Sequence, residues 1–441
     1  MLPLSTPTAS TGSNSSIFRR LFRAQESGLI LVILLMAAVL TFRGGTKPGE
    51  IQRIALPPGT TTEEVGGVLV ITSPTDVPLR ELRAALGESK SGGANVRIVA
   101  GSSKVEVASA SNPRVIGADA DQKLLVSRSE SKFLNTQNLV LLATQASFIA
   151  VMAVGMTAVI ILGGIDLSVG SIYGLAAVVG AFALQSLQLS ILGPEANSLN
   201  AAAGGAPWYL AVPVGIGVCC LVGAICGGVS GSMIVGLRVH PFIITLGMMA
   251  MLSGLVFVLT RGQSITGFPE SFTKGFMKMP AGNVYPVPVA IMVLTMLAGM
   301  FVLSQTVLGR RIFAIGGNEI AAKYAGIPVG GVKVIVYVAS GALAGLSAAM
   351  YLGYYGAAAP GAGQGYELDV IAAAVIGGAS LSGGRGSAFG AVLGALLVQM
   401  IGNGMLVLDI DQSYTQIVKG AAIVVAVVLD QAKARLTPGS R

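Results

Sequence analysis

Long apolar segments recur along most of the chain and constrain its fold more than any other feature. A helix that crosses a membrane needs about 20 predominantly apolar residues. Only 11% of the residues are charged, against roughly a quarter in soluble domains. The sequence therefore predicts an all-α polytopic membrane protein with about ten transmembrane helices, over residues 28–42, 139–162, 165–187, 208–236, 241–260, 285–306, 332–355, 367–380, 387–408 and 415–430. Several of these segments are short or interrupted by glycine, which is typical of helices that bend around a pathway.

Acidic residues are concentrated in residues 43–135, which contain ten of the twenty. This predicts a small soluble α/β module inserted between the first and second spans. Residues 64–72 predict a strand, 78–88 predict a helix, and 95–110 predict two strands joined by a tight turn. The module sequence holds no metal-ligand cluster, nucleophile set or phosphate loop. The functions compatible with it are a spacer or packing domain, a docking surface for an extracytoplasmic partner, and a ligand sensor.

The placement of Lys and Arg predicts the orientation, because short cytoplasmic loops carry an excess of both. With the N-terminus in the cytoplasm, the inner segments carry twelve of these residues and the short outer loops carry three. The tails 1–27 and 432–441 are therefore expected in the cytoplasm and the 43–135 module outside it. The formal charge of +8 then reflects inside-positive loops and not a nucleic-acid surface. Residues 17–42 also allow a signal peptide, but no clear cleavage site follows, which favours an uncleaved anchor.

The sequence lacks the patterns of the common catalytic and metal sites. It has no G-x-x-x-x-G-K-[ST] loop, so ATP chemistry is not expected on this chain. Its single histidine, His240, precedes Pro241 and is expected to be a helix-terminus residue. Cys219, Cys220 and Cys226 share one apolar stretch and are interpreted as packing residues. We therefore expect no catalytic residue, cofactor or metal, and a transporter of this kind would take its energy from another subunit.

The loop between the sixth and seventh expected spans, residues 308–331, contains the stretch "AIGGNEIAAKYAGIP". Gly316 and Gly317 predict a sharp turn, and Asn318 is a favourable helix N-cap residue. Glu319 and Lys323 are four residues apart, a favourable spacing for an ion pair on a helix surface.

The end of this short helix is also marked in the sequence. Gly326 is expected to end it, and Pro328 prevents its continuation. The result is a rigid two-turn helix on the cytoplasmic face. Such a helix can transmit a motion to another protein, although an ordinary amphipathic surface helix has the same pattern.

Asp166 is the one acidic residue that lies clearly within an apolar block, in "GGIDLSVGSIYG" at 163–174. An aspartate at the centre of a spanning helix costs roughly 2.5–3.5 kcal/mol, so a role is expected. Two roles are compatible with the sequence. Asp166 caps the following helix through the backbone N–H of Ser168 or Val169, or it forms a polar gate on a pathway.

An echo of this motif, "GGASLSGGRGSAFG", occurs at 377–390 and suggests an internal duplication. The glycines would let helices break and cross closely, and the serines would satisfy the freed backbone groups. Glu367 and Asp369 are expected at an outer helix start, where acidic side chains suit the positive end of the helix dipole. The candidates for a pathway or gate are Asp166, Ser168, Ser171, Ser382 and Ser387.

Five motifs in order resemble the permease subunits of bacterial ABC importers of the ribose/xylose/arabinose type: "GGIDLSVGS", "HPFIITLGMM", "GNEIAAKYAGI", "GYELDVIAAAVIGGASLSGGRGS" and "IVKGAAIVVAVVLD". The similarity covers roughly residues 133–433, and the permease domain is expected over 136–431. It implies translocation of a monosaccharide, a ribose-like pentose or a hexose, across the inner membrane. It also implies three partners: an ATPase subunit with two P-loop halves, a periplasmic sugar-binding protein and a second permease copy.

The resemblance further implies that the 308–331 loop couples the permease to the ATPase. The coupling residues would be Gly317, Asn318, Glu319, Ala321, Ala322 and Gly326. The 43–135 module is a departure, since family members usually connect the first two spans by a short outer loop. Two alternatives stay open: an ABC permease for branched-chain amino acids or nucleosides, and, in a different class, a stand-alone secondary transporter or channel.

Overall fold

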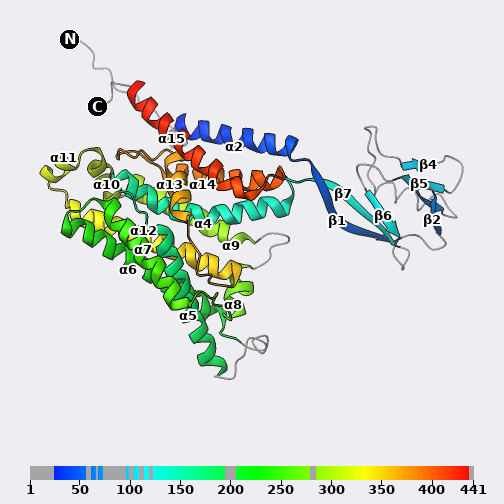
Figure 1. Ribbon diagram of the computed structural model, residues 1–441, viewed down its shortest axis with the longest axis horizontal. Helices are drawn as coiled ribbons and strands as arrows, with labels where there is room; N and C mark the ends of the chain where they lie inside the picture. The colour runs from blue at the N-terminus through cyan, green and yellow to red at the C-terminus, as the bar shows by residue number, and fades with distance from the viewer. Residues whose placement is uncertain are drawn as a thin grey trace, which may run out of the picture. The chain divides into compact units, whose positions relative to one another are not determined.

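The computed structural model describes residues 24–55, 61–65, 68–72, 96–98, 104–108, 114–118, 123–193, 205–278 and 285–436 (Figure 1). These residues form two compact units. The helical unit comprises the described residues within 1–37, 139–406 and 410–441, and the strand unit those within 38–138 and 407–409.

Eight helices of the described chain are long and apolar enough to cross a membrane. Each coincides with an expected span, so the prediction of a polytopic membrane protein is confirmed. Their bounds are α2 (Ala24–Arg43), α4 (Thr136–Ile161), α5 (Val169–Leu192), α6 (Trp208–Leu237), α7 (Pro241–Thr260), α9 (Pro286–Gln305), α12 (Val329–Tyr355) and α14 (Ala388–Val407).

The two other expected spans also fall on helices. The segment 415–430 lies in α15 (Thr415–Leu436). The segment 367–380 corresponds to α13 (Tyr366–Ile376), which has 11 residues and is therefore about 16 Å long. That is about half of the roughly 30 Å hydrocarbon core of a bilayer, so α13 by itself is too short to cross it. Shorter helices lie in the loops: α8 (Glu270–Phe272), η2 (Thr273–Met277), α10 (Val307–Gly317), α11 (Glu319–Tyr324) and η3 (Gln412–Tyr414).

A seam of small residues holds α6 against α12. A Cβ atom on Gly223 would lie 2.0 Å from the carbonyl oxygen of Gly341, and one on Gly227 would lie 2.1 Å from that of Tyr337. The two backbones therefore approach so closely that only glycine fits, as in helix pairs within lipid. Cys219 is free and buried beside this seam, and its thiol donates to the carbonyl of Ala176 at 3.3 Å. This agrees with the interpretation of the cysteines as packing residues.

The strand unit contains two antiparallel sheets. One has the order β1-β7-β6, and the other has the order β2-β3-β5-β4. A register shift between Pro48 and Ile51 interrupts the pairing of β1 with β7. The bounds are β1 (Thr46–Ala55), β2 (Thr61–Val65), β3 (Val68–Thr72), β4 (Val96–Ile98), β5 (Lys104–Ala108), β6 (Arg114–Ala118) and β7 (Lys123–Ser131).

These sheets correct part of the sequence prediction for residues 43–135. The pair of strands within 95–110 is confirmed as β4 and β5. The single strand over 64–72 is wrong, because this stretch is divided between β2 and β3, which pair with each other. The Gly-Gly dipeptide at 66–67 was the missed signal, since such pairs commonly join hairpin strands. The predicted helix over 78–88 lies outside the described residues.

Candidate functional site

The α10–α11 segment forms a capped helical hairpin at the edge of the helical unit (Figure 1). The side-chain Oδ1 of Asn318 accepts a hydrogen bond from the backbone N–H of Ala321 at 2.9 Å. Gly326 has φ +79°, and the N–H of Ile327 donates to the carbonyl of Ala322 at 3.1 Å. The start at Asn318 and the end at Gly326 are therefore as the sequence predicts, because both depend on local capping geometry.

The short helix α11 turns a small residue inward and large residues outward. The side chain of Ala322 is buried, whereas Ile320 is 70% and Tyr324 is 88% exposed. Among the other expected coupling residues, Gly317, Asn318, Glu319, Ala321 and Gly326 are exposed. The helix thus presents an apolar and aromatic surface that the described chain leaves uncovered.

The ion pair of Glu319 is not the expected one. Both carboxylate oxygens of Glu319 lie 2.8 Å from the Nζ of Lys333 at the start of α12, so the predicted pairing with Lys323 is wrong. Glu319 and Lys323 have the right spacing on one helix, but the return of the chain into α12 brings a second lysine within reach. The Glu319 side chain is about half exposed and that of Lys333 is 21% exposed, so solvent screens the pair and its contribution to stability is small, but it links α11 to the spanning helix that follows.

The two glycines before Asn318 do not form the expected turn. The helix α10 continues through Gly317, and the chain becomes extended at Asn318. Gly316 instead permits a close contact, since a Cβ atom there would lie 1.7 Å from the carbonyl oxygen of Ile161 and 2.6 Å from the nitrogen of Gly384. The N–H of Gly384 donates to that same carbonyl at 2.9 Å. The ends of α10 and α4 and the loop before α14 therefore meet backbone to backbone.

Asp166 is completely buried between α4 and α5. Its Oδ1 accepts hydrogen bonds from the backbone N–H of Ser168 at 2.9 Å and from the Ser168 hydroxyl at 2.5 Å. The expected hydrogen bond to Ser168 is thus present just before α5 begins. Its Oδ2 is buried without a hydrogen-bond partner among the described residues.

The echoed motifs end their preceding helices in the same way. In the first copy, Gly163 has φ +78° and the N–H of Gly164 donates to the carbonyl of Val159. In the second, Gly378 has φ +99° and the N–H of Ala379 donates to the carbonyl of Ala374. The left-handed residue is the first glycine of one copy and the second glycine of the other. The two copies share a helix-ending turn but do not correspond residue by residue.

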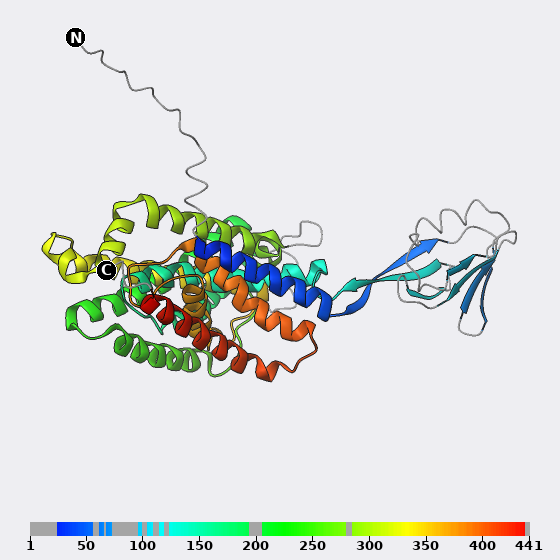
Figure 2. The ribbon, with the colours of Figure 1, turned by 90° about the horizontal axis from the view of Figure 1, so that it is seen from above.

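The four candidate serines lie in different surroundings. Ser168 and Ser171 are buried, and the Ser171 hydroxyl donates to the carbonyl of Ser168 at 2.8 Å. Ser387 accepts from the N–H of Gly390 at 3.1 Å and donates to Glu26 at 2.7 Å, where α2 lies along α14 (Figure 2). Ser382 is exposed.

A cavity of about 190 Å³ lies between α5, α7 and the segment before α13. Ser171 and Gly174 line it from α5, and Ser253 lines it from α7. The third wall is formed by Pro360, Ala362, Gly363, Gln364 and Glu367. The cavity thus combines several polar groups with apolar walls and is partly open to the surface of the helical unit, and Ser171 is the pathway candidate that lines it.

Part of the irregular segment before α13, Ala362 and Gly363, lies directly against α5. A Cβ atom on Gly170 would lie 2.4 Å from the carbonyl oxygen of Gly363, and one on Gly174 would lie 2.6 Å from that of Ala362. The expected spans place the start of α5 and the start of α13 at opposite membrane faces, yet here they are in contact. Irregular backbone at membrane depth is tolerated where it is buried in protein or lines a cavity, and a half-helix that starts there is typical of a binding site.

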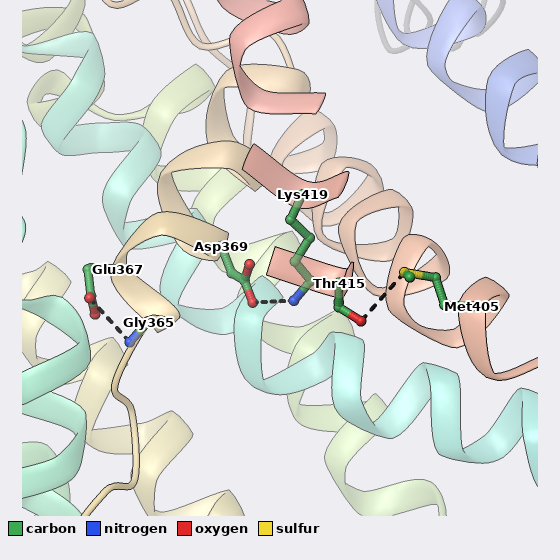
Figure 3. A network of polar contacts seen from close by, with 6 residues as sticks. All are labelled: Gly365, Glu367, Asp369, Met405, Thr415 and Lys419. Atoms are coloured by element: carbon green, nitrogen blue, oxygen red, sulfur yellow. Dashed lines mark hydrogen bonds and ion pairs between the residues drawn. The ribbon is translucent and has the colours of Figure 1, made fainter. Parts of the chain in front are cut away.

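Two acidic side chains are fixed at the start of α13 (Figure 3). Oε1 of Glu367 accepts from the N–H of Gly365 at 3.2 Å. Asp369 forms an ion pair with Lys419 of α15 at 2.7 Å, and the two side chains are 12% and 15% exposed. Sequence reasoning missed this pair, although Lys419 is the one basic residue of the expected span 415–430.

The remaining predictions for polar residues concern His240 and metals. The Nδ1 of His240 accepts from the N–H of Phe242 at 3.3 Å, so this residue is the N-cap of α7, as predicted. The described residues contain no cluster of three or more His, Cys, Asp or Glu side chains that could hold a metal ion.

Residues 138–427 match the family described as "Branched-chain amino acid transport system / permease component". The ribose import permease protein RbsC of Escherichia coli K12 is 40% identical over 313 residues, which cover 70% of this chain and 90% of that protein. The D-allose transport system permease protein AlsC of the same organism is 36% identical over 69% of this chain and 86% of its own length. The galactose/methyl galactoside import permease protein MglC of Haemophilus influenzae is 32% identical over 70% of this chain and 90% of its own length. No solved structure matches.

These comparisons define a class, the membrane-embedded permease components of import systems. The chain belongs to this permease family. The predicted resemblance is confirmed, and so is the prediction of a transport subunit rather than an enzyme.

Proposed function

We propose that the chain is the permease subunit of an ABC importer that moves a monosaccharide across the bacterial inner membrane. The observation that carries this proposal is the capped helix α11, which is exposed, is linked to α12 by the Glu319–Lys333 ion pair, and follows α10, whose Gly316 contacts the end of α4. The names of the relatives, which specify ribose, D-allose and galactose, favour a sugar over a branched-chain amino acid.

The proposed coupling residues are Gly317, Asn318, Glu319, Ala321, Ala322 and Gly326. A cytoplasmic ATPase subunit with two P-loop halves would contact the outward side chains Ile320 and Tyr324. Movement of α11 would pass through Lys333 into α12 and through Gly316 to the ends of α4 and the loop before α14. Small shifts of this kind switch packed helices between discrete arrangements.

The remaining partners follow from the same assignment. A periplasmic sugar-binding protein would deliver the sugar to two permease copies. The chain would cross the membrane about ten times, with α13 and the irregular segment before it together making the crossing for which α13 alone is too short. Both termini would lie in the cytoplasm and the 43–135 module outside. Selectivity would rest mostly with the binding protein, and the polar candidates Asp166, Ser168, Ser171, Ser382 and Ser387 would lie along or support the pathway.

A pull-down of the tagged protein in mild detergent tests the partners. Co-purification of a protein with two Walker-type phosphate loops supports the proposal. If no ATPase is recovered, even after gentle crosslinking, a stand-alone transporter or channel becomes the better account. Repeating the pull-down without residues 43–135 shows which partner depends on that module.

A double variant tests the coupling segment. Glu319→Ala with Gly326→Ala removes the link to Lys333 and strains the positive-φ cap. We expect ATP hydrolysis to persist and sugar uptake to be lost. A Gly331→Ala variant is the control, because a Cβ atom there meets nothing within 4 Å. Normal uptake by the double variant would contradict the coupling role.

A further inference from the structure

We propose that the cavity beside α13 is the permease's own sugar-binding site, in which Glu367, Gln364, Ser171 and Ser253 contact the hydroxyl groups of the sugar in transit. This inference rests on the proposed function and adds to it the residues that recognise the substrate.

The size of the cavity fits a small polar molecule. Its volume of about 190 Å³ is somewhat larger than the roughly 150 Å³ of an engineered protein cavity that binds one benzene ring. It is smaller than the roughly 300–1,000 Å³ of pockets for drug-sized ligands. A single sugar ring is of this scale, whereas a disaccharide is not.

The chemistry of the lining fits a neutral, hydroxyl-rich ligand. A carboxylate accepts hydrogen bonds, an amide both donates and accepts, and serine hydroxyls do both. The Ser171 hydroxyl already donates to the carbonyl of Ser168, so its lone pairs are directed to other donors. No Lys or Arg is among the described residues that line the cavity. The carboxylate of a free amino acid would therefore find no cation there, which disfavours the branched-chain amino acid alternative.

The carboxylate of Glu367 is held in place before any ligand arrives. Its Oε1 accepts from Gly365, as Figure 3 shows. A Cβ atom on Gly170 would lie 2.4 Å from its Oε2, so the absence of a side chain on Gly170 makes room for the carboxylate. The neighbouring ring of Tyr366 packs against that of Tyr173 at 5.4 Å. A fixed acceptor loses little entropy on binding and so can discriminate between ligands.

The three walls come from separate elements, which suits a transient site. Two walls are the spanning helices α5 and α7, and the third is the irregular segment before α13. A relative shift of any of these elements alters the cavity. The site would then form in one arrangement of the helices and be lost in the other, as release to the opposite side requires.

Uptake by vesicles that contain the complete importer gives the first test. The wild-type complex is assayed with radiolabelled D-ribose, D-allose and D-galactose, and the sugar with the largest ATP-dependent uptake is used thereafter. Ser253→Leu fills the cavity, and we expect uptake to fall about tenfold or more while ATP hydrolysis stays within about twofold. Glu367→Gln keeps the acceptor for the N–H of Gly365 but removes the charge. We expect sugar uptake to fall about tenfold, because this is the usual contribution of one charge-assisted hydrogen bond.

The control for these variants is Ser190→Leu. Ser190 is an exposed residue on α5 and does not line the cavity, so sugar uptake by the Ser190→Leu variant should equal that of the wild type. Wild-type uptake by both Ser253→Leu and Glu367→Gln would overturn the assignment. If the wild-type complex takes up none of the three sugars, the proposed function fails, and this inference fails with it.

Binding is tested directly by placing a thiol in the cavity. In Ser253→Cys, reaction with a hydrophilic methanethiosulfonate should slow about threefold or more at saturating sugar. It should not slow with L-valine, and Ser190→Cys should respond to neither. The native thiols are measured in the wild type as background. Equal rates with and without sugar would overturn the inference, and protection by L-valine alone would contradict it in favour of an amino acid.

Discussion

Replacing Gly316 by alanine should loosen the contact that holds the end of α10 against the end of α4. The added Cβ would lie 1.7 Å from the Ile161 carbonyl oxygen, whereas Cβ contacts below 3.0 Å are essentially never seen. The backbones must therefore move apart by about 1.3 Å, the difference between these distances. Both contacting atoms are backbone atoms, so no side chain can rotate away to relieve the clash.

The energetic cost follows from two contributions. Overpacking of a tight contact costs about 1–3 kcal/mol, and loss of the hydrogen bond from Gly384 to Ile161 costs about 0.5–1.5 kcal/mol. Alanine recovers roughly 0.5–1 kcal/mol through its better helix propensity. The net destabilisation is therefore about 0.5–4 kcal/mol, with a middle value of about 2 kcal/mol. Gly317→Ala is the matched control, because a Cβ there meets nothing within 4 Å and gains the same propensity.

The assay combines thermal unfolding in detergent with uptake and ATP hydrolysis in vesicles. We expect Gly316→Ala to unfold at lower temperature and to transport less sugar per ATP, and Gly317→Ala to match or exceed the wild type in stability. Equal stability and equal coupling in the two variants would refute the close contact between α10 and α4.

Three further changes give distinct expectations. Asp166→Asn keeps an Oδ1 acceptor for both hydrogen bonds from Ser168 and buries no charge, so thermal stability and sugar uptake should be retained. Loss of uptake by a folded variant would instead show that Asp166 acts as a charge-dependent gate. Asp369→Leu leaves Lys419 without its partner and should lower stability by about 3 kcal/mol in thermal unfolding. Adding Lys419→Met should restore most of that loss, and an undiminished loss in the double variant would show that the pair is not the cause. Gly326→Ala alone should cost about 1 kcal/mol at the end of α11, and an unchanged unfolding temperature would contradict the need for its positive φ.

The parts of the structure that follow from local rules could be predicted from the sequence. In a membrane, every backbone polar group needs an internal partner, so long apolar runs have to be helices. The ends of α11 were also predictable, because Asn318 and Gly326 act on backbone groups only a few residues away.

The parts that depend on distant segments could not be predicted in the same way. Lys333 replaces Lys323 as the partner of Glu319 because of how α12 returns to α11. Gly316 permits a close contact with the end of α4, a helix more than a hundred residues earlier in the chain. The sequence around Gly316 by itself indicates only a turn. The contact between Gly170 and the segment before α13 likewise depends on tertiary folding. The cavity that Glu367 lines depends on the same contact, so it could not be predicted from local sequence either.

The most direct test of the account is sugar uptake by vesicles that contain the permease with its ATPase and binding protein. We predict accumulation of one of the three labelled sugars when ATP is supplied on the side of the ATPase, and none when ATP is replaced by a non-hydrolysable analogue. Equal uptake with ATP and with the analogue would contradict the account, because it would show a channel or secondary transporter that needs no coupling helix.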